Sequence, residues 1–150
     1  MWWPVAAELA TECLVIAPDL PGHGDTPGRD DLRPGELALE LAALVDALDL
    51  SRAPVVVGHS TSAVLAGAFA ASVSSPLLVT VDEPSPGPVS AAAWHPGGHL
   101  PRHDPLVVRA YQSWFTGPAV PLPATLTRRS VDGRAAADPV RFAEELRALL

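Results

Sequence analysis

The segment that most constrains the fold is a run of three valines, Val55, Val56 and Val57, followed at once by Gly58 and a stretch rich in alanine. Short continuous apolar runs are typical of strands that are buried on both faces of a sheet. The small residues of 61–73 would let a helix approach such a sheet closely. A strand that passes directly into a helix needs a sharp turn with small neighbouring side chains. The sequence therefore predicts a buried strand, a tight turn and a helix in immediate succession.

Apolar runs and helical patterns alternate along the first half of the chain. The leucines of one expected helix recur at spacings of four, three and four, which aligns them on one face: Leu37, Leu41, Leu44 and Leu48. In chain order, helices and strands are expected to alternate, beginning with a helix: 3–10, 13–17, 34–48, 55–57, 61–73 and 77–81. Strands that alternate with helices predict a parallel sheet with crossover helices.

Prolines are frequent beyond residue 82, and the pattern changes there. Asp104-Pro105 and Asp138-Pro139 each predict the start of a helix, because an aspartate caps the first turn and proline suits the first helical position. Between these two helices we expect irregular chain. We therefore divide the sequence into an α/β region, 1–84, and a Pro-rich, helical, lid-like region, 85–150.

Composition excludes several classes of partner. The net charge is −7, and all ten basic residues are scattered arginines, so no nucleic-acid-binding patch is expected. Cys13 is the only cysteine; no intramolecular disulfide can form, and we expect a small buried thiol. The first residues have no basic segment, and no apolar run reaches the ~20 residues that span a bilayer. We expect a cytoplasmic protein without a membrane partner.

Around the valine run the sequence resembles a known family. Gly58-His59-Ser60-Thr61-Ser62 is similar to the nucleophile elbow of α/β-hydrolases, G-x-S-x-G, with Ser62 in place of the second glycine. Residues 15–26, which contain the loop DLPGHGDT, resemble the strand and loop that precede the elbow in this family, and residues 78–82 resemble the strand after it. The resemblance covers residues 1–85 and implies a three-layer α/β fold with a short parallel sheet.

The resemblance also implies a chemistry. Ser60 would be the nucleophile, and the backbone N–H of Thr61 would stabilise the oxyanion. Asp82, or Glu83 beside it, would be the acid that orients a base, as in some members of the family; the alternative is that this residue holds the loop through local hydrogen bonds. The substrate would be a small molecule with an ester or related acyl bond, and neither a metal nor an organic cofactor is implied. The oligomeric state is left open.

Several elements of the family pattern are missing. A His-Gly oxyanion loop, the strands before the first helix and the late strands with the acid and the histidine are not found, so the chain resembles a truncated member. One missing strand would lie between 14–17 and 55–57. Without that strand, residues 14–17 and 55–57 must pair directly with each other, or the inner edges of the sheet are exposed.

The remaining candidates have alternative interpretations. His59 is expected to shape the site rather than act as base, and Asp19 and His23 are expected to shape their turn. A solvated loop is expected around three histidines spaced four apart, although one of them could reach Ser60 as base: His95, His99 and His103. Trp114 and Phe115 could line an acyl pocket or pack in the core.

Two other functions stay open beside hydrolysis. The chain could be an inactive or binding-only relative, or the elbow could serve an acyltransferase or a cofactor-free haloperoxidase, since fold does not fix function.

Overall fold

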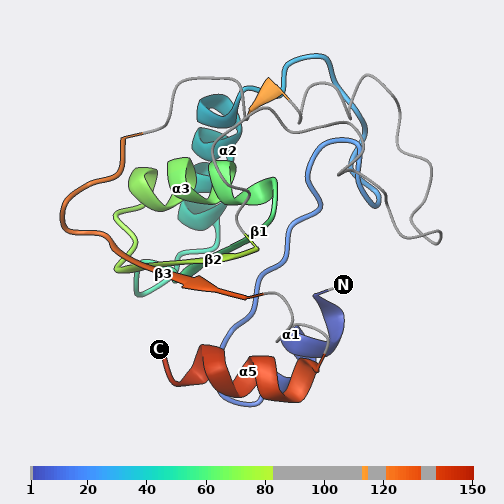
Figure 1. Ribbon diagram of the computed structural model, residues 1–150. Coiled ribbons are helices and arrows are strands. Elements are labelled where there is room, and N and C mark those ends of the chain that lie inside the picture. Colours follow the sequence, from blue (N-terminus) through green and yellow to red (C-terminus); the bar gives the residue numbers. More distant parts are fainter. Residues whose placement is uncertain (1, 83–112, 115–120, 133–137) are drawn as a thin grey trace.

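The computed structural model describes residues 2–82, 113–114, 121–132 and 138–150. The main helices and strands of these segments are labelled in Figure 1. In chain order they are α1 (Trp3–Leu9), α2 (Pro34–Ala47), β1 (Val56–His59), α3 (Ser62–Ser72), β2 (Leu77–Val81), β3 (Thr127–Val131) and α5 (Pro139–Arg147).

The three strands form one parallel sheet in the order β1-β2-β3. Val57 lies opposite Val79 in the first pair, and Val79 lies opposite Arg129 in the second. Every residue of β2 is buried, as the continuous apolar run predicted for a central strand. Ser75, just before β2, donates its hydroxyl to the Pro54 carbonyl oxygen at 2.7 Å and so ties together the starts of β1 and β2.

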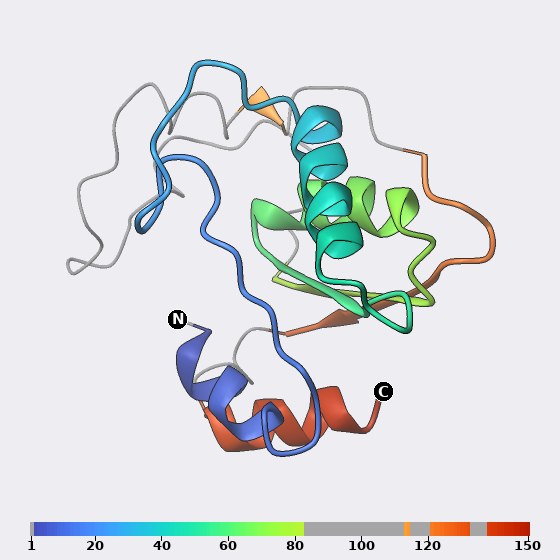
Figure 2. The ribbon, with the colours of Figure 1, turned by 180° about the vertical axis from the view of Figure 1, so that it is seen from behind.

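Helices cover both faces of the sheet, which confirms the predicted three-layer α/β fold. One layer holds α3 against the sheet and α2 against α3, whereas α1 and α5 pack together on the opposite face (Figures 1 and 2). On the α1 and α5 side the buried cluster joins side chains of both helices to those of β2: Val5, Leu77, Val79, Val81, Phe142, Ala143 and Leu146.

The two helices of the first layer differ in how they use their apolar residues. The small residues of α3 are buried against the sheet, as expected: Ala63, Ala66, Gly67 and Ala70. In α2, Leu37 is 2% exposed, whereas Leu44 and the C-cap residue Leu48 are 37% and 45% exposed. The apolar face predicted for α2 is therefore covered at its N-terminal end and largely open at the other.

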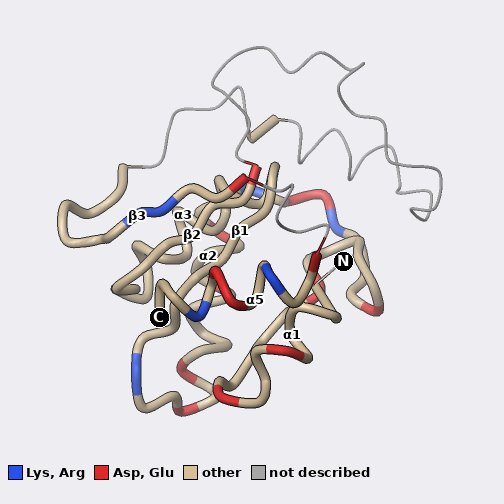
Figure 3. The backbone as a smooth tube through the Cα atoms, turned by 60° about the horizontal axis from the view of Figure 1, so that its bottom comes forward, with Lys and Arg blue, Asp and Glu red and all other residues tan. Residues whose placement is uncertain are grey.

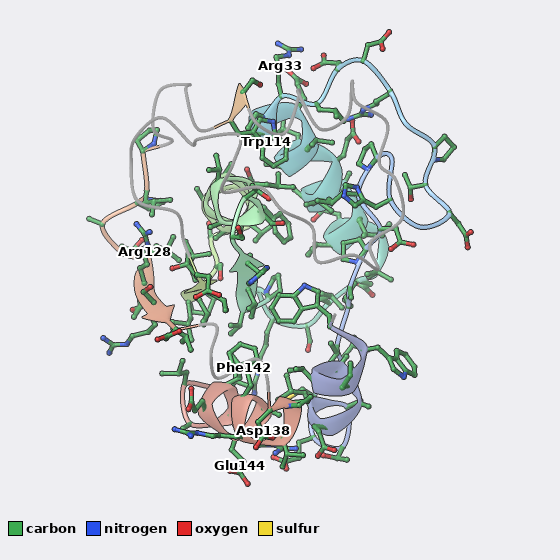
Figure 4. The ribbon with its side chains drawn as sticks, turned by 45° about the vertical axis from the view of Figure 1, so that its right-hand side comes forward. Arg33, Trp114, Arg128, Asp138, Phe142 and Glu144 are labelled. Atoms are coloured by element: carbon green, nitrogen blue, oxygen red, sulfur yellow. The ribbon has the colours of Figure 1, made fainter. Side chains whose placement is uncertain are left out.

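The predicted start of the last helix is confirmed. Asp138 is the N-cap of α5, and its side chain accepts a hydrogen bond from the Arg141 N–H at 3.2 Å. Phe142 and Leu146 lie on the buried face of this helix, at 0% and 4% exposure. Figure 4 shows Phe142 directed from α5 toward the sheet. The helix expected from Asp104 lies outside the described residues.

The strand expected at 13–17 is not formed. Cys13 lies in the turn after α1, where its N–H donates to the Leu9 carbonyl oxygen at 2.9 Å. Residues 14–17 pair with no strand in the described part of the chain, and Leu14 and Ile16 are 76% and 41% exposed. An apolar run becomes a strand only where a neighbour takes up its backbone hydrogen bonds. Here β1 pairs with β2 on one side, and no described strand lies on its other side.

The irregular chain expected before α5 is also a wrong prediction, because it contains β3. This strand has the sequence TRRSV, its first four residues are exposed, and it forms the edge of the sheet. A polar edge strand has no buried face, so its sequence resembles that of a loop. The division at residues 84 and 85 stays a prediction, since 83–112 are not described.

Candidate functional site

Ser60 occupies the turn between β1 and α3 with a φ of 51°. A positive φ costs free energy in a residue that has a side chain, and such strain persists only where the surroundings impose it. Here the Ser60 N–H donates to the Val81 carbonyl oxygen at 2.7 Å, while the Ser60 carbonyl accepts from the Ala63 N–H at 3.0 Å. The turn is therefore held between the end of β2 and the first turn of α3.

Gly58 allows the close approach of strand and helix that this turn requires. A Cβ at position 58 would lie 2.5 Å from the Ala66 Cβ and 3.1 Å from the Ala63 Cα. Real Cβ atoms do not come so close to a neighbouring carbon, so no larger residue fits without movement. Ser62, which stands at the family's second glycine position, is the first residue of α3 and is accommodated there.

Thr61 is the N-cap of α3, without a side-chain capping hydrogen bond. The first N–H groups of a helix have no partner within the helix, and they lie at the positive end of its dipole. The backbone of Thr61 therefore lies beside Ser60 at the positive end of the α3 dipole.

Asp82 and His59 meet at the carboxyl ends of neighbouring strands. The Asp82 carboxylate lies 3.7 Å from His59 Nε2, close enough for an ion pair when the histidine is protonated. Asp82 has a φ of 48°, and its N–H donates to the Val131 carbonyl oxygen at 3.1 Å. Both side chains are partly exposed, at 24% for His59 and 49% for Asp82.

Trp2 contacts the His59 side of the Asp82–His59 pair, and the sequence did not indicate this contact. Its ring meets the His59 ring edge-on, with centroids 6.4 Å apart and planes at 85°, and it also contacts Phe142 of α5 with centroids 6.2 Å apart. The start of the chain therefore packs against the elbow histidine. No local pattern in the first residues could predict this contact, because the two segments are distant in sequence.

The loop DLPGHGDT has the turn-shaping contacts expected of it. Gly24 has a φ of 51°, and a Cβ there would lie 1.9 Å from Asp19 Oδ2. The Asp25 N–H points to the same Asp19 oxygen at 3.4 Å, and His23 Nδ1 lies 3.2 Å from the Pro21 carbonyl oxygen. These contacts hold the loop's shape.

The structure separates the remaining candidates into two groups. Trp114 is 6% exposed, belongs to the core cluster with Leu37, and donates its Nε1–H to the Leu32 carbonyl oxygen at 2.6 Å (Figure 4). It packs in the core. The others lie outside the described residues: Glu83, His95, His99, His103, Asp104 and Phe115.

Within the described residues, no group of three or more His, Cys, Asp or Glu side chains is placed to bind a metal ion. No helix in the same segments is both long and apolar enough to cross a bilayer. Cys13 is free and partly buried.

One comparison with known proteins identifies a family. The family model described as "Alpha/beta hydrolase family" matches residues 1–150. No curated protein and no solved structure matches the chain significantly. The match extends beyond residues 1–85, whose motifs resemble the family, and includes β3 and α5.

Proposed function

Because the chain belongs to the alpha/beta hydrolase family, we propose that it hydrolyses ester or related acyl bonds of small molecules, with Ser60 as the nucleophile. One observation carries the proposal: Ser60 has a φ of 51° at a turn where strand and helix approach too closely for a Cβ at Gly58. The N-cap of α3 is the next residue, Thr61. Ser60 lies in the turn just beyond the end of β1 and is partly exposed, which supports access of a substrate to its hydroxyl.

The reaction would proceed through an acyl-enzyme. Ser60 Oγ would attack the carbonyl carbon while a base takes its proton, and the negative oxygen would be stabilised by the Thr61 N–H. Collapse of this intermediate breaks the ester bond, and the base returns the proton to the leaving alcohol. Water then attacks the acyl group by the same route and releases the acid and free Ser60.

Asp82 is our candidate for the acid that orients the base. Asp82 follows β2, so its carboxylate lies at the same edge of the sheet as Ser60, and this placement supports the role. We assign His59 to shaping the site, because side chains of adjacent residues around such a turn point apart. The candidates for the base remain His95, His99 and His103.

Labelling with a fluorophosphonate probe tests the proposal. The folded chain should react once, and Ser60→Ala should abolish the labelling. Ser62→Ala, which removes the hydroxyl two residues further on, is the matched control and should leave labelling intact. Intact mass locates the modification, and circular dichroism confirms that each variant is folded.

Two results would contradict the proposal. Labelling that survives in Ser60→Ala would place the reactive group elsewhere. A folded wild-type chain that does not label would support the binding-only alternative, because a serine without a base is a weak nucleophile. Where labelling occurs, products formed with added alcohol or peroxide would separate an acyltransferase or haloperoxidase from a simple esterase.

A further inference from the structure

The ring of His59, the last residue of β1, is in contact with two other segments of the chain. The Asp82 carboxylate lies 3.7 Å from His59 Nε2, and the Trp2 ring meets the imidazole edge-on with centroids 6.4 Å apart. The His59 side chain is 24% exposed. Because Ser60 follows His59 directly, contacts that hold the His59 ring also restrain the chain just before the strained turn.

The strained turn at Ser60 needs a restraint on each side. The φ angle of Ser60 is the rotation about its N–Cα bond, which separates His59 and β1 from the Ser60 carbonyl and α3. A positive φ such as 51° persists only where the surroundings impose it. On the helix side the Ser60 carbonyl accepts from the Ala63 N–H, and on the strand side the Ser60 N–H donates to the Val81 carbonyl oxygen. The contacts of the His59 ring add to the restraint on the strand side.

Trp2 connects the His59 ring to the core of the α1 and α5 layer. Its ring contacts Phe142 with centroids 6.2 Å apart, and Phe142 is 0% exposed. Trp2 also packs against the buried cluster that includes Phe142 and Val79 of β2. Aromatic pairs of this kind are directional as well as apolar. A ring that is fixed by a fully buried neighbour can in turn fix the ring of His59.

The contact between Trp2 and His59 depends on their rings, and Trp2 brings no charge to it. Helix α1 contains a single charged residue, Glu8, which lies near the opposite end of the helix from Trp2 (Figure 3). Asp82, at the end of β2, is the charged partner of His59. A neutral substitution of Trp2 therefore removes the aromatic contact and leaves the charges of the site unaltered.

We propose that Trp2 is a positioning residue. Its ring holds the His59 ring, and His59 in turn holds the strained backbone of Ser60 beyond the end of β1. Trp3, the next residue, is 81% exposed and has no such place in the core. The effect on catalysis rests on the proposed hydrolysis, whereas the restraint on the Ser60 backbone does not.

Amide hydrogen exchange followed by NMR tests the restraint without any measurement of activity. In Trp2→Leu, exchange of the Ser60 amide should become faster by up to about tenfold, the factor that an aromatic pair supplies. This factor should exceed any change at Val79 in the centre of β2. Trp3→Leu is the matched control and should change neither amide, and Trp2→Phe, which keeps a ring, should restore slow exchange at Ser60. An unchanged Ser60 rate in Trp2→Leu, or a rise no larger than that of Val79, overturns the proposal.

A double-mutant cycle tests whether Trp2 acts through His59. Trp2→Leu should speed exchange of the Ser60 amide in the wild-type background. It should have little further effect in His59→Leu, where the partner ring is already absent. Equal effects in the two backgrounds would show that Trp2 acts on Ser60 by another route, and the proposal would be wrong.

Fluorophosphonate labelling connects the restraint to the proposed reaction. Per folded molecule, Trp2→Leu should label several-fold more slowly than wild type, and Trp2→Phe and Trp3→Leu should label at nearly the wild-type rate. A wild-type chain that does not label would contradict the hydrolysis and leave the exchange result standing. A wild-type chain that labels, with Trp2→Leu labelling equally fast, would overturn the positioning role and leave the hydrolysis standing.

Discussion

At the scale of single residues, Asp31 and Arg33 form an ion pair just before α2. Arg33 donates from Nε to Asp31 Oδ1 at 3.0 Å and from a terminal nitrogen to Oδ2 at 2.8 Å, and its backbone N–H reaches Oδ1 at 3.2 Å. These hydrogen bonds favour the ionised carboxylate and lower the pKa of Asp31 from 3.8 to about 2. Because the pKa is lowered on folding, the pair favours the folded state above pH 3.8, and that contribution is lost as the pH falls through about 2.

Replacing the arginine should reverse this shift. In Arg33→Gln, the pKa of Asp31 should rise toward its ordinary value, as measured by the pH dependence of its carboxyl NMR signal. Arg52→Gln removes another exposed arginine and should leave the pKa of Asp31 unchanged. An Asp31 that titrates identically in wild type and Arg33→Gln would show that the contact is not maintained in solution.

Some residues of the candidate site are positioned by local structure, and others by contacts between segments that are distant in sequence. Ser60, Thr61 and Gly58 could be identified from sequence, because the turn they form is local and its small-residue requirement leaves a pattern. The contacts of His59 with Asp82 and Trp2 could not. Asp82 reaches His59 only because β1 and β2 end side by side, and Trp2 arrives with a helix from the opposite layer.

At the scale of elements, the packing of α3 on β1 depends on the absence of a side chain at Gly58. We expect Gly58→Ala to destabilise the fold by about 1–3 kcal/mol, the usual cost of an added methyl in a well-packed contact. The Ala66 Cβ would be 2.5 Å from the new methyl, and both atoms belong to elements held by the sheet. Urea unfolding followed by circular dichroism measures the change.

Gly35 provides the control for this change. It lies in the first turn of α2, and a Cβ there would meet nothing within 4 Å. Gly35→Ala should therefore stabilise the chain by up to about 1 kcal/mol, because alanine favours helix over glycine. If both glycine variants changed stability in the same direction, the close approach at Gly58 would not control the packing.

The elements themselves show why sequence predicted some and missed others. Strand β2 and helix α5 were predicted because one is a buried apolar run and the other has an aspartate cap followed by proline. Residues 13–17 have the same apolar character as β2, yet they pair with no described strand. Strand β3 pairs along its whole length although its sequence is polar. Pairing depends on the neighbouring strand, which the sequence of a single segment does not specify.

At the scale of the whole molecule, the first and last described helices close one side of the sheet together. Arg147 of α5 donates to the Glu8 carbonyl oxygen of α1, and its Nε lies 3.4 Å from a carboxylate oxygen of Glu12. Between this layer and the sheet lies Phe142, which is 0% exposed and belongs to one cluster with Val5 of α1 and Val79 of β2. Three segments that are far apart in sequence therefore share one core.

Removing the Phe142 side chain should weaken that whole layer. We expect Phe142→Ala to cost about 3–5 kcal/mol, since it leaves a cavity lined by both helices and the sheet. A domain is commonly stable by only ~5–15 kcal/mol, so the variant would lose a large share of its stability. Val140→Ala on the same helix, where the side chain is 50% exposed, should change stability little. Urea unfolding read by far-ultraviolet circular dichroism compares the two variants. Equal effects would mean that α5 is not packed on the sheet, and Trp2, whose ring contacts both His59 and Phe142, would then lose one of these two contacts.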